Sequence, residues 1–155
     1  MSEGRAAAIL ATSNRGRGDQ ARGDVPEERT VDEAEVYRLH RMWVDANCTW
    51  NVDDFVPHME EDVACFAGDG SVLRGRDQLV REWRMLGEMI EDEFEMETSE
   101  VQLEVFTEAA WLVYEFHLRG VLDKAPFDQR GRATELYRKR DGRWRMAVGH
   151  FSWLQ

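Results

Sequence analysis

The chain has 155 residues, of which 43% are hydrophobic and 10% aromatic, and this is enough apolar surface for the core of one domain. It leaves no room for two full catalytic domains. The formal net charge of -11, from 31 acidic and 20 basic residues, has the wrong sign for binding a phosphate backbone, so we expect no nucleic-acid partner.

Residues 1–29 have the composition of a disordered tail, because they contain no aromatic residue and four glycines. A helix is expected directly after them, since Thr30 and Glu33 have the spacing of a capping box. Apolar residues then recur at spacings of three and four up to about Asn47. They are Val36, Leu39, Trp43 and Ala46.

A short second helix is expected over residues 53–59. A strand over residues 63–66, a Gly-Asp-Gly turn and a return strand over residues 72–74 should follow it. Gly75 precedes a third helical pattern. Its apolar face consists of Leu79, Val80, Trp83, Leu86 and Ile90.

After this helix the apolar period changes from 3.6 to two, which is typical of strands with one buried and one solvated face. Strands are predicted over residues 94–105, 110–118, 132–139 and 144–153, the last two joined by a hairpin turn at Asp141-Gly142. Residues 120–131 contain a proline and several charges, so we expect a loop there that borders the mouth of a pocket.

Cys48 and Cys65 are too few for a disulfide framework and lack the close pairing of a zinc site, so we expect a reducing, cytoplasmic location. No apolar run approaches the roughly 18 residues of a membrane span. We therefore expect no association with a membrane.

Three motifs carry a resemblance to a known family: Gly75-Arg76-Asp77 at a helix start, the hairpin from Arg132 to Met146, and the closing Gly149-His150-Phe151-Ser152. Residues 31–155 resemble the nuclear transport factor 2-like superfamily. Within it they are most similar to SnoaL-like and ketosteroid-isomerase-like domains and to the association domain of calcium/calmodulin-dependent kinase. The resemblance implies an α+β domain over residues 30–155, with a cone-like curved antiparallel or mixed β-sheet wrapped around three N-terminal helices.

The resemblance also implies a class of function. Cones of this family hold an apolar cavity at the open end and dimerise through the outer face of the sheet, and they include isomerases, cyclases, dehydratases and epoxide hydrolases. We therefore expect a homodimer that acts as a cofactor-free acid/base enzyme of the isomerase, cyclase or dehydratase (lyase) type on an apolar or aromatic small molecule. The alternative is a non-catalytic ligand-binding or oligomerisation module of the same fold.

Two positions of the family's acid/base machinery can be carried over to this sequence. The general base of ketosteroid isomerases, at the end of the first strand, falls on Ala67, so it is missing there, and the nearby Asp69 is more simply a turn residue. The family's oxyanion-donating acid falls at or within one residue of Glu135, which would share a cavity face with Tyr137. The alternative is a surface Glu135 that faces solvent or an arginine such as Arg145.

Strand alternation decides which side chains face the cavity. In residues 110–118 we expect the set with Leu112, Tyr114 and Phe116 to face inward, whereas a register slipped by one residue would turn Glu115 and His117 inward as an acid/base pair.

In the last strand the two alternating sets cannot both face the cavity. Family analogy directs Ala147, Gly149 and Phe151 inward and turns the stripe from Trp144 to His150 toward a dimer partner. His150 is then more simply an interface or structural residue, although it stays a catalytic candidate.

The candidate site follows from these assignments. The candidate catalytic residues are Glu135, Tyr114, His117 and His150. His40 and Tyr37 on the first helix are also in a position to reach the cavity. The candidate substrate-binding residues are aromatic: Trp43, Phe66, Trp83, Phe116, Tyr137 and Phe151. We expect no cofactor, and no metal because the four histidines lack the spacing of metal ligands.

Overall fold

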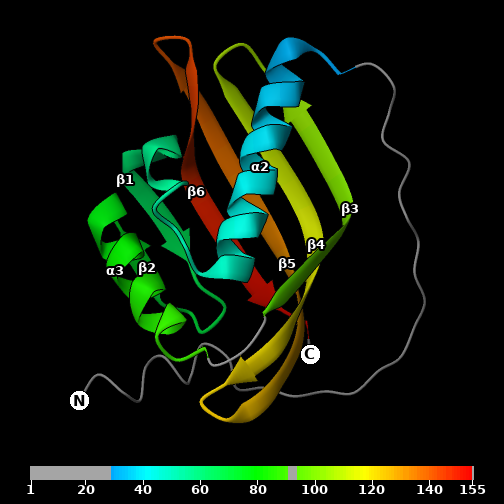
Figure 1. Cartoon of the computed structure of the whole chain (residues 1–155). Helices are drawn as coiled ribbons and strands as arrows, with labels where there is room; N and C mark the ends of the chain where they lie inside the picture. The colour runs from blue at the N-terminus through cyan, green and yellow to red at the C-terminus, as the bar shows by residue number, and fades with distance from the viewer. Residues whose placement is uncertain (1–28, 91–93, 155) are drawn as a thin grey trace.

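The computed structural model describes residues 29–90 and 94–154, so the predicted tail lies outside the described residues except for Arg29. A six-stranded sheet with the order β2-β1-β6-β5-β4-β3 carries two α-helices (Figure 1). The elements, in chain order, are α2 (Val31–Thr49), the 3-10 helix η1 (Val56–His58), β1 (Met59–Phe66), β2 (Val72–Arg74), α3 (Arg76–Gly87), β3 (Glu95–Val105), β4 (Ala109–Leu122), β5 (Ala125–Arg140) and β6 (Arg143–Trp153).

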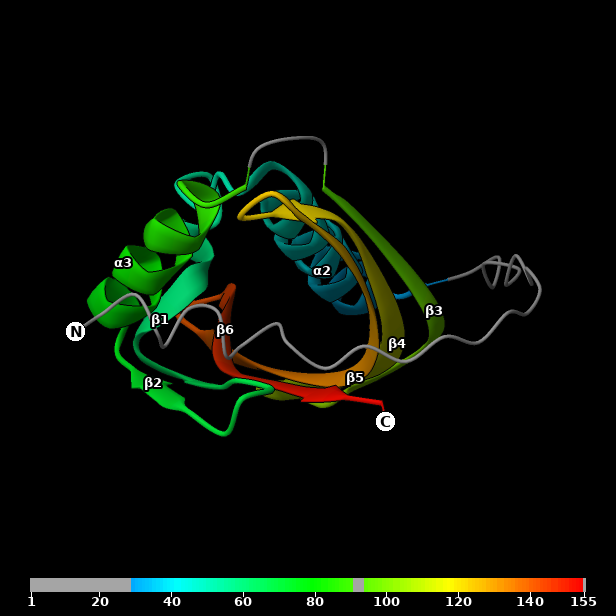
Figure 2. The ribbon, with the colours of Figure 1, turned by 90° about the horizontal axis from the view of Figure 1, so that it is seen from below.

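The sheet is mixed and strongly curved. Neighbouring strands are antiparallel except β1 and β6, which are parallel. Figure 2 shows the sheet curving around α2, with α3 beside β1 and β2 and the wrap left unclosed. The expected α+β cone is therefore confirmed. Its three N-terminal helical segments are two α-helices and one short 3-10 turn.

Helix α2 begins as the capping box predicts. The Thr30 hydroxyl accepts a hydrogen bond from the Glu33 amide at 3.2 Å, and the Glu33 carboxylate accepts one from the Thr30 amide at 2.7 Å. The predicted apolar stripe lies in the core, and His40 is buried beside it. The helix therefore packs inside the cone through this stripe, and the polar side chains of His40 and Asn47 are buried with it.

The predicted second helix, residues 53–59, is wrong in extent. Only Val56–His58 is helical, and it is a 3-10 turn with Pro57 near its start. Met59 already belongs to β1, where it pairs with Met146 of β6. The pairing of β1 with β6 therefore begins at a residue that the prediction placed in the helix, and the chain is extended from there on.

The predicted loop over residues 120–131 is also wrong, because β4 and β5 continue through it as one long hairpin. Leu122 pairs with Ala125, and the two residues between them, Asp123 and Lys124, have φ values of 47° and 65°. Two consecutive positive φ angles are the signature of a type I′ turn, whose twist matches that of the flanking strands. The hairpin closes with neither glycine nor asparagine in the turn.

The last strand departs from simple alternation at one residue. Tyr137 pairs with Met146 and Leu136 pairs with Val148, so Ala147 is an extra residue in β6. The expectation that only one alternating set faces inward is therefore wrong. Before the bulge the inward residues are Trp144 and Met146, and after it they are Gly149, Phe151 and Trp153.

The bulge also overturns the expected role of Trp144 at a dimer surface. Trp144 and Met146 are buried in the core of this chain. The Trp144 indole N–H donates to Asp32 at 3.0 Å, and Lys139 Nζ lies 2.8 Å from the same carboxylate. These bonds tie the first turn of α2 to the β5–β6 hairpin.

The β4–β5 turn gives a direct test of this geometry. A residue with a Cβ pays a steric penalty at positive φ that glycine does not, so Lys124→Gly should stabilise the fold by about 0.5 kcal/mol after the loss of unfolded-state entropy. Lys124→Ala keeps the Cβ and serves as the control, and it should not raise the free energy of unfolding. Urea denaturation monitored by circular dichroism measures both, and a destabilised glycine variant would contradict the assigned turn.

Candidate functional site

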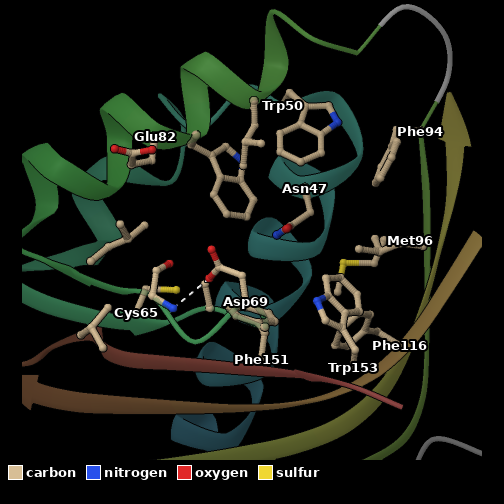
Figure 3. A pocket seen from close by; sticks show the side chains of 18 of the residues that line it. Asn47, Trp50, Cys65, Asp69, Glu82, Phe94, Met96, Phe116, Phe151 and Trp153 are labelled. Carbon is tan, nitrogen blue, oxygen red and sulfur yellow. Dashed lines mark hydrogen bonds between the residues drawn. The ribbon is translucent and has the colours of Figure 1, made fainter. Parts of the chain in front are cut away.

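A cavity of about 260 Å³ lies at the open end of the cone, between α3, the end of α2 and the sheet (Figure 3). Aromatic side chains from five segments of the chain form most of its wall. They are Trp50, Trp83, Phe94, Phe116, Phe151 and Trp153.

The rings contact one another around the cavity. Trp50 follows α2 in a left-handed conformation, with φ of 55°, and its ring stacks on Trp83 of α3 at a centroid distance of 5.2 Å. Trp50 also meets Phe94 edge-on at 5.2 Å. On the sheet side Phe116 meets Trp153 edge-on at 5.5 Å. Such tilted and offset contacts are favourable for aromatic pairs, so the wall is a packed shell of rings.

A few polar groups interrupt this shell. Asp69, in the turn between β1 and β2, accepts a hydrogen bond from the Ser71 amide at 2.8 Å, and its carboxylate projects into the cavity (Figure 3). Asn47 lies in the same space and donates to the Trp43 carbonyl of α2 at 2.7 Å. Glu82 of α3 is a second carboxylate in the wall. Among the described residues, no lysine, arginine or histidine lines the cavity.

Cys65 of β1 also borders the cavity, as a neutral thiol. Burial, and to a smaller extent the nearby Asp69 charge, raises the pKa of Cys65 to about 12. A thiol needs to ionise before it becomes a strong nucleophile. Cys65 is therefore a small apolar part of the wall.

A separate cluster of polar side chains surrounds Glu135 of β5, which has 0% of its surface exposed. The Tyr114 hydroxyl donates to Glu135 Oε1 at 2.7 Å, and the Tyr137 hydroxyl donates to Oε2 at 2.7 Å. His40 Nδ1 lies 3.2 Å from each carboxylate oxygen. The buried carboxylate thus has partners from α2, β4 and β5, as the burial of a charge requires.

This environment keeps both phenols protonated. Burial, and then the Glu135 charge, raise the pKa of Tyr114 and of Tyr137 well above the ordinary value for tyrosine. Both hydroxyls therefore remain hydrogen-bond donors to the carboxylate. The other ring nitrogen of His40, Nε2, is buried and has no hydrogen-bond partner among the described residues.

A layer of side chains separates this Glu135 cluster from the cavity, since none of its four residues lines the cavity wall. Cys65, Gly149 and Glu135 are adjacent across three strands. The Phe151 ring covers Gly149, with Cε2 lying 3.4 Å from the point where a Cβ of residue 149 would stand. Phe151 therefore belongs to the cavity wall on one side and shields the cluster on the other.

The structure brings together some of the predicted catalytic residues. Glu135 and Tyr114 are hydrogen-bonded, and His40 joins them from α2, with the Tyr37 ring 5.8 Å from its own. The alternative of a surface Glu135 is wrong. His117 and His150 lie elsewhere.

Strand β4 has the register expected from its apolar set, because Leu112, Tyr114 and Phe116 are buried. The slipped register is wrong. His117 Nε2 lies 2.6 Å from Asp128, and Glu115 pairs with Arg132 at 3.0 Å, both on the outer face of the sheet.

The predicted substrate-binding residues fall into three groups. Trp83, Phe116 and Phe151 line the cavity. Trp43 and Tyr137 are fully buried in the core behind it. Phe66 lies on the outer face of the sheet, 40% exposed, with its ring 6.1 Å from that of His150.

Three cavity rings, Trp50, Phe94 and Trp153, were not among the predicted residues. Alternation on the last strand places Trp153 in the same set as Phe151, so its inward position could have been found from the sequence. The position of the Trp50 ring depends on the left-handed backbone conformation of Trp50 itself at the end of α2. No sequence pattern indicates this conformation.

Residues 36–155 match the family model of the SnoaL-like domain, and the chain belongs to this family. A comparison with curated proteins gives no match. Among the described residues, no group of side chains has the arrangement of a metal site, and no helix has the length and apolar character needed to cross a bilayer.

Solved structures share the fold at low sequence identity. A Streptomyces avermitilis protein, provisionally described as a dehydratase of the nuclear transport factor 2-like family, is 16% identical with a TM-score of 0.70, over 79% of this chain and 96% of that one. A Novosphingobium aromaticivorans protein, provisionally described as a scytalone dehydratase, is 13% identical with a TM-score of 0.70, over 81% and 85%. The association domain of a Caenorhabditis elegans calcium/calmodulin-dependent kinase is 12% identical with a TM-score of 0.62, over 78% and 95%.

The Glu135 cluster can be tested through its phenols. Tyr114→Phe and Tyr137→Phe each remove one donor from a buried carboxylate, and each should lower the free energy of unfolding by about 1.5–3 kcal/mol. Tyr37→Phe is the matched control, because no hydrogen bond links Tyr37 to Glu135. Urea denaturation gives the three values, and equal stabilities of all three variants would contradict the described network.

Proposed function

We propose that this SnoaL-like domain binds a small apolar or aromatic molecule in its cavity and performs cofactor-free acid/base chemistry on it, of the isomerase, cyclase or dehydratase type. One observation carries the proposal. The Asp69 carboxylate projects into a cavity whose wall includes six aromatic rings. Concave aromatic surfaces with a few polar groups are typical of small-molecule sites.

The size of the cavity limits the ligand. A volume of about 260 Å³ is near the lower end of ligand pockets, which start at roughly 300 Å³. A molecule of about two fused rings matches this space. Its flat faces would pack against the side chains of Trp83 and Phe116, and its polar atoms would lie near Asp69.

Asp69 supplies the proton-transfer step in this proposal. Its carboxylate takes a proton from a carbon next to a ligand carbonyl, which leaves an enolate and a neutral carboxylic acid. Return of the proton to another carbon completes an isomerisation, and its delivery to a departing hydroxyl completes a dehydration. The Ser71 amide, which donates to Asp69, holds the carboxylate in place between the two steps.

Glu135 and Tyr114 are the second acid/base candidates. They meet a ligand only if the Phe151 ring moves away from Gly149, because that ring covers the strand between the cavity and Glu135. Their proposed role is therefore conditional on a side-chain movement, whereas Asp69 needs none. The relatives provisionally described as dehydratases support a proton-transfer reaction of this kind.

The second candidate function is non-catalytic binding. It is favoured by the burial of the Glu135 cluster, because none of its four titratable side chains lines the cavity. Ala67, at the position of the isomerase base, is consistent with it. One experiment separates the two candidates.

The test uses 2-tetralone, a bicyclic aromatic ketone, with the protein in D₂O. If Asp69 is a base, the protein exchanges the ketone's α-protons for deuterium, and Asp69→Asn slows this exchange by about 100-fold, within the usual range for a general base. Glu88→Gln, an exposed acid outside the cavity, is the control. NMR follows the exchange, and a ketone that binds without exchanging supports the non-catalytic candidate.

A second pair of variants tests whether the ketone binds in this cavity. Cys65→Leu adds side-chain volume to the cavity wall and should abolish 2-tetralone binding measured by calorimetry. Ala64→Leu adds a larger side chain to the neighbouring residue of β1, which does not line the cavity, and should leave binding unchanged. Equal affinities of the two variants would place the ligand outside this cavity.

We further propose that the protein is a homodimer through the outer face of its sheet. Leu136 of β5, 40% exposed, lies between Trp111 of β4 and Val148 of β6 in register, and Phe66 of β1 is 40% exposed on the same face. Adjacent exposed apolar residues on a sheet commonly mark an interface.

Light scattering with size-exclusion chromatography tests this dimer. Leu136→Lys should convert it to a monomer, because a lysine ammonium would be buried without a partner at the interface. Phe106→Lys is the control, since Phe106 is 52% exposed in the turn between β3 and β4. A Leu136→Lys dimer, or a wild-type monomer at micromolar concentration, would contradict the proposal.

A further inference from the structure

We infer that the cavity prefers a positively charged ligand, an aromatic amine in its ammonium form, over a neutral or anionic one. This inference rests on the proposed function, since it assumes that the cavity binds a small molecule. It goes beyond that proposal by naming the charge of the ligand. Three features of the described wall carry it.

The first feature is the charge of the wall itself. Asp69 and Glu82 are its ionisable carboxyl groups, and among the described residues no lysine, arginine or histidine borders the cavity to balance them. A ligand in the cavity lies close to both carboxylates, so their charges attract a cation and repel an anion. An anionic ligand would meet two negative charges and no positive one.

The second feature is the set of partners around Glu82. Two arginines of α3 form ion pairs elsewhere: Arg84 binds Asp53, and Arg76 lies 3.9 Å from Glu61. No described residue forms an ion pair with Glu82 or with Asp69. The cavity therefore has two carboxylates without a cation of the protein's own.

The third feature is the aromatic wall. The face of an aromatic ring carries a partial negative charge, and an ammonium group within about 6 Å of the ring centre is attracted to it, most strongly by tryptophan. Trp50, Trp83 and Trp153 contribute three indoles to the wall, and Phe94, Phe116 and Phe151 contribute three phenyl rings. The rings thus favour a cation through the same surface that holds an aromatic skeleton.

These features act on different parts of one ligand. The rings would contact the bicyclic skeleton and the side of the ammonium group, and the carboxylates would lie toward its charge. Figure 3 shows Asp69 on the sheet side of the cavity and Glu82 on α3, so the two carboxylates approach the space from different elements.

Calorimetry at pH 7 with three probes of nearly equal shape tests the inference. The probes are 2-naphthylmethylamine, which is cationic, 2-naphthylmethanol, which is neutral, and 2-naphthoate, which is anionic. We expect the amine to bind about tenfold more tightly than the alcohol, the size of a cation–π and carboxylate contribution in a partly desolvated site. Naphthoate should bind most weakly.

Variants of the two carboxylates test whether the preference for the cationic probe comes from the cavity wall. Glu82→Gln and Asp69→Asn should each reduce the amine-to-alcohol ratio of affinities about threefold. Glu88→Gln also removes one negative charge but lies outside the cavity, and it should leave the ratio unchanged.

The outcomes separate this inference from the function on which it rests. If the alcohol or naphthoate binds as tightly as the amine, the charge preference is overturned and the cavity remains a binding site. A ratio that falls equally in Glu88→Gln also overturns it, because the preference would then come from the overall charge of -11. If none of the three probes binds, both the proposed function and the inference are overturned.

Discussion

The Glu135 carboxylate is the interaction on which the arrangement of helix and sheet depends. A charge with no exposed surface is stable only when hydrogen bonds replace its lost water, and here the donors come from Tyr114, Tyr137 and His40. Because His40 lies on α2 and the tyrosines lie on β4 and β5, the carboxylate is satisfied in one position of the helix only. Apolar packing alone would tolerate small shifts of α2 along the sheet, whereas these bonds do not.

At the other end of the same sheet, β6 departs from regular alternation next to the cavity. The bulge at Ala147 moves β6 out of simple alternation, so Gly149 follows it on the inner face. Gly149 has no side chain on this face, and the Phe151 ring packs over it. The sheet's curvature and the left-handed Trp50 then place rings around a space that they do not fill.

Much of the fold could be predicted from the sequence, and the exceptions have local causes. The capping box at Thr30, the stripe of α2 and the alternation of β4 are short-range patterns, and the structure contains each of them. The bulge in β6 could not be predicted, because alternation assumes that every residue has a partner. The turn at Asp123 and Lys124 was missed because a lysine is not typical of the second central position of a type I′ turn, which favours glycine.

The site was harder to predict than the fold for a different reason. Glu135 and His40 are 95 positions apart, and only the closed cone brings them together. The choice between a buried and a solvent-facing Glu135 therefore could not be made from strand periodicity. Likewise, Asp69 has the features of a turn residue in the sequence, and its access to the cavity depends on how β1 and β2 meet α3.

The two carboxylates, Asp69 and Glu135, differ in a way that bears on chemistry. Glu135 has its hydrogen-bond partners from the protein, so it does not need a ligand to complete its hydrogen bonding. Asp69 has one protein donor, the Ser71 amide, and faces the cavity, so a ligand can complete its hydrogen bonding. Strong internal hydrogen bonding thus suits Glu135 to holding the cone together, while incomplete hydrogen bonding suits Asp69 to acting on a ligand. A single ring, Phe151, keeps these roles apart, because its removal from Gly149 would give the ligand a path to the better-satisfied carboxylate.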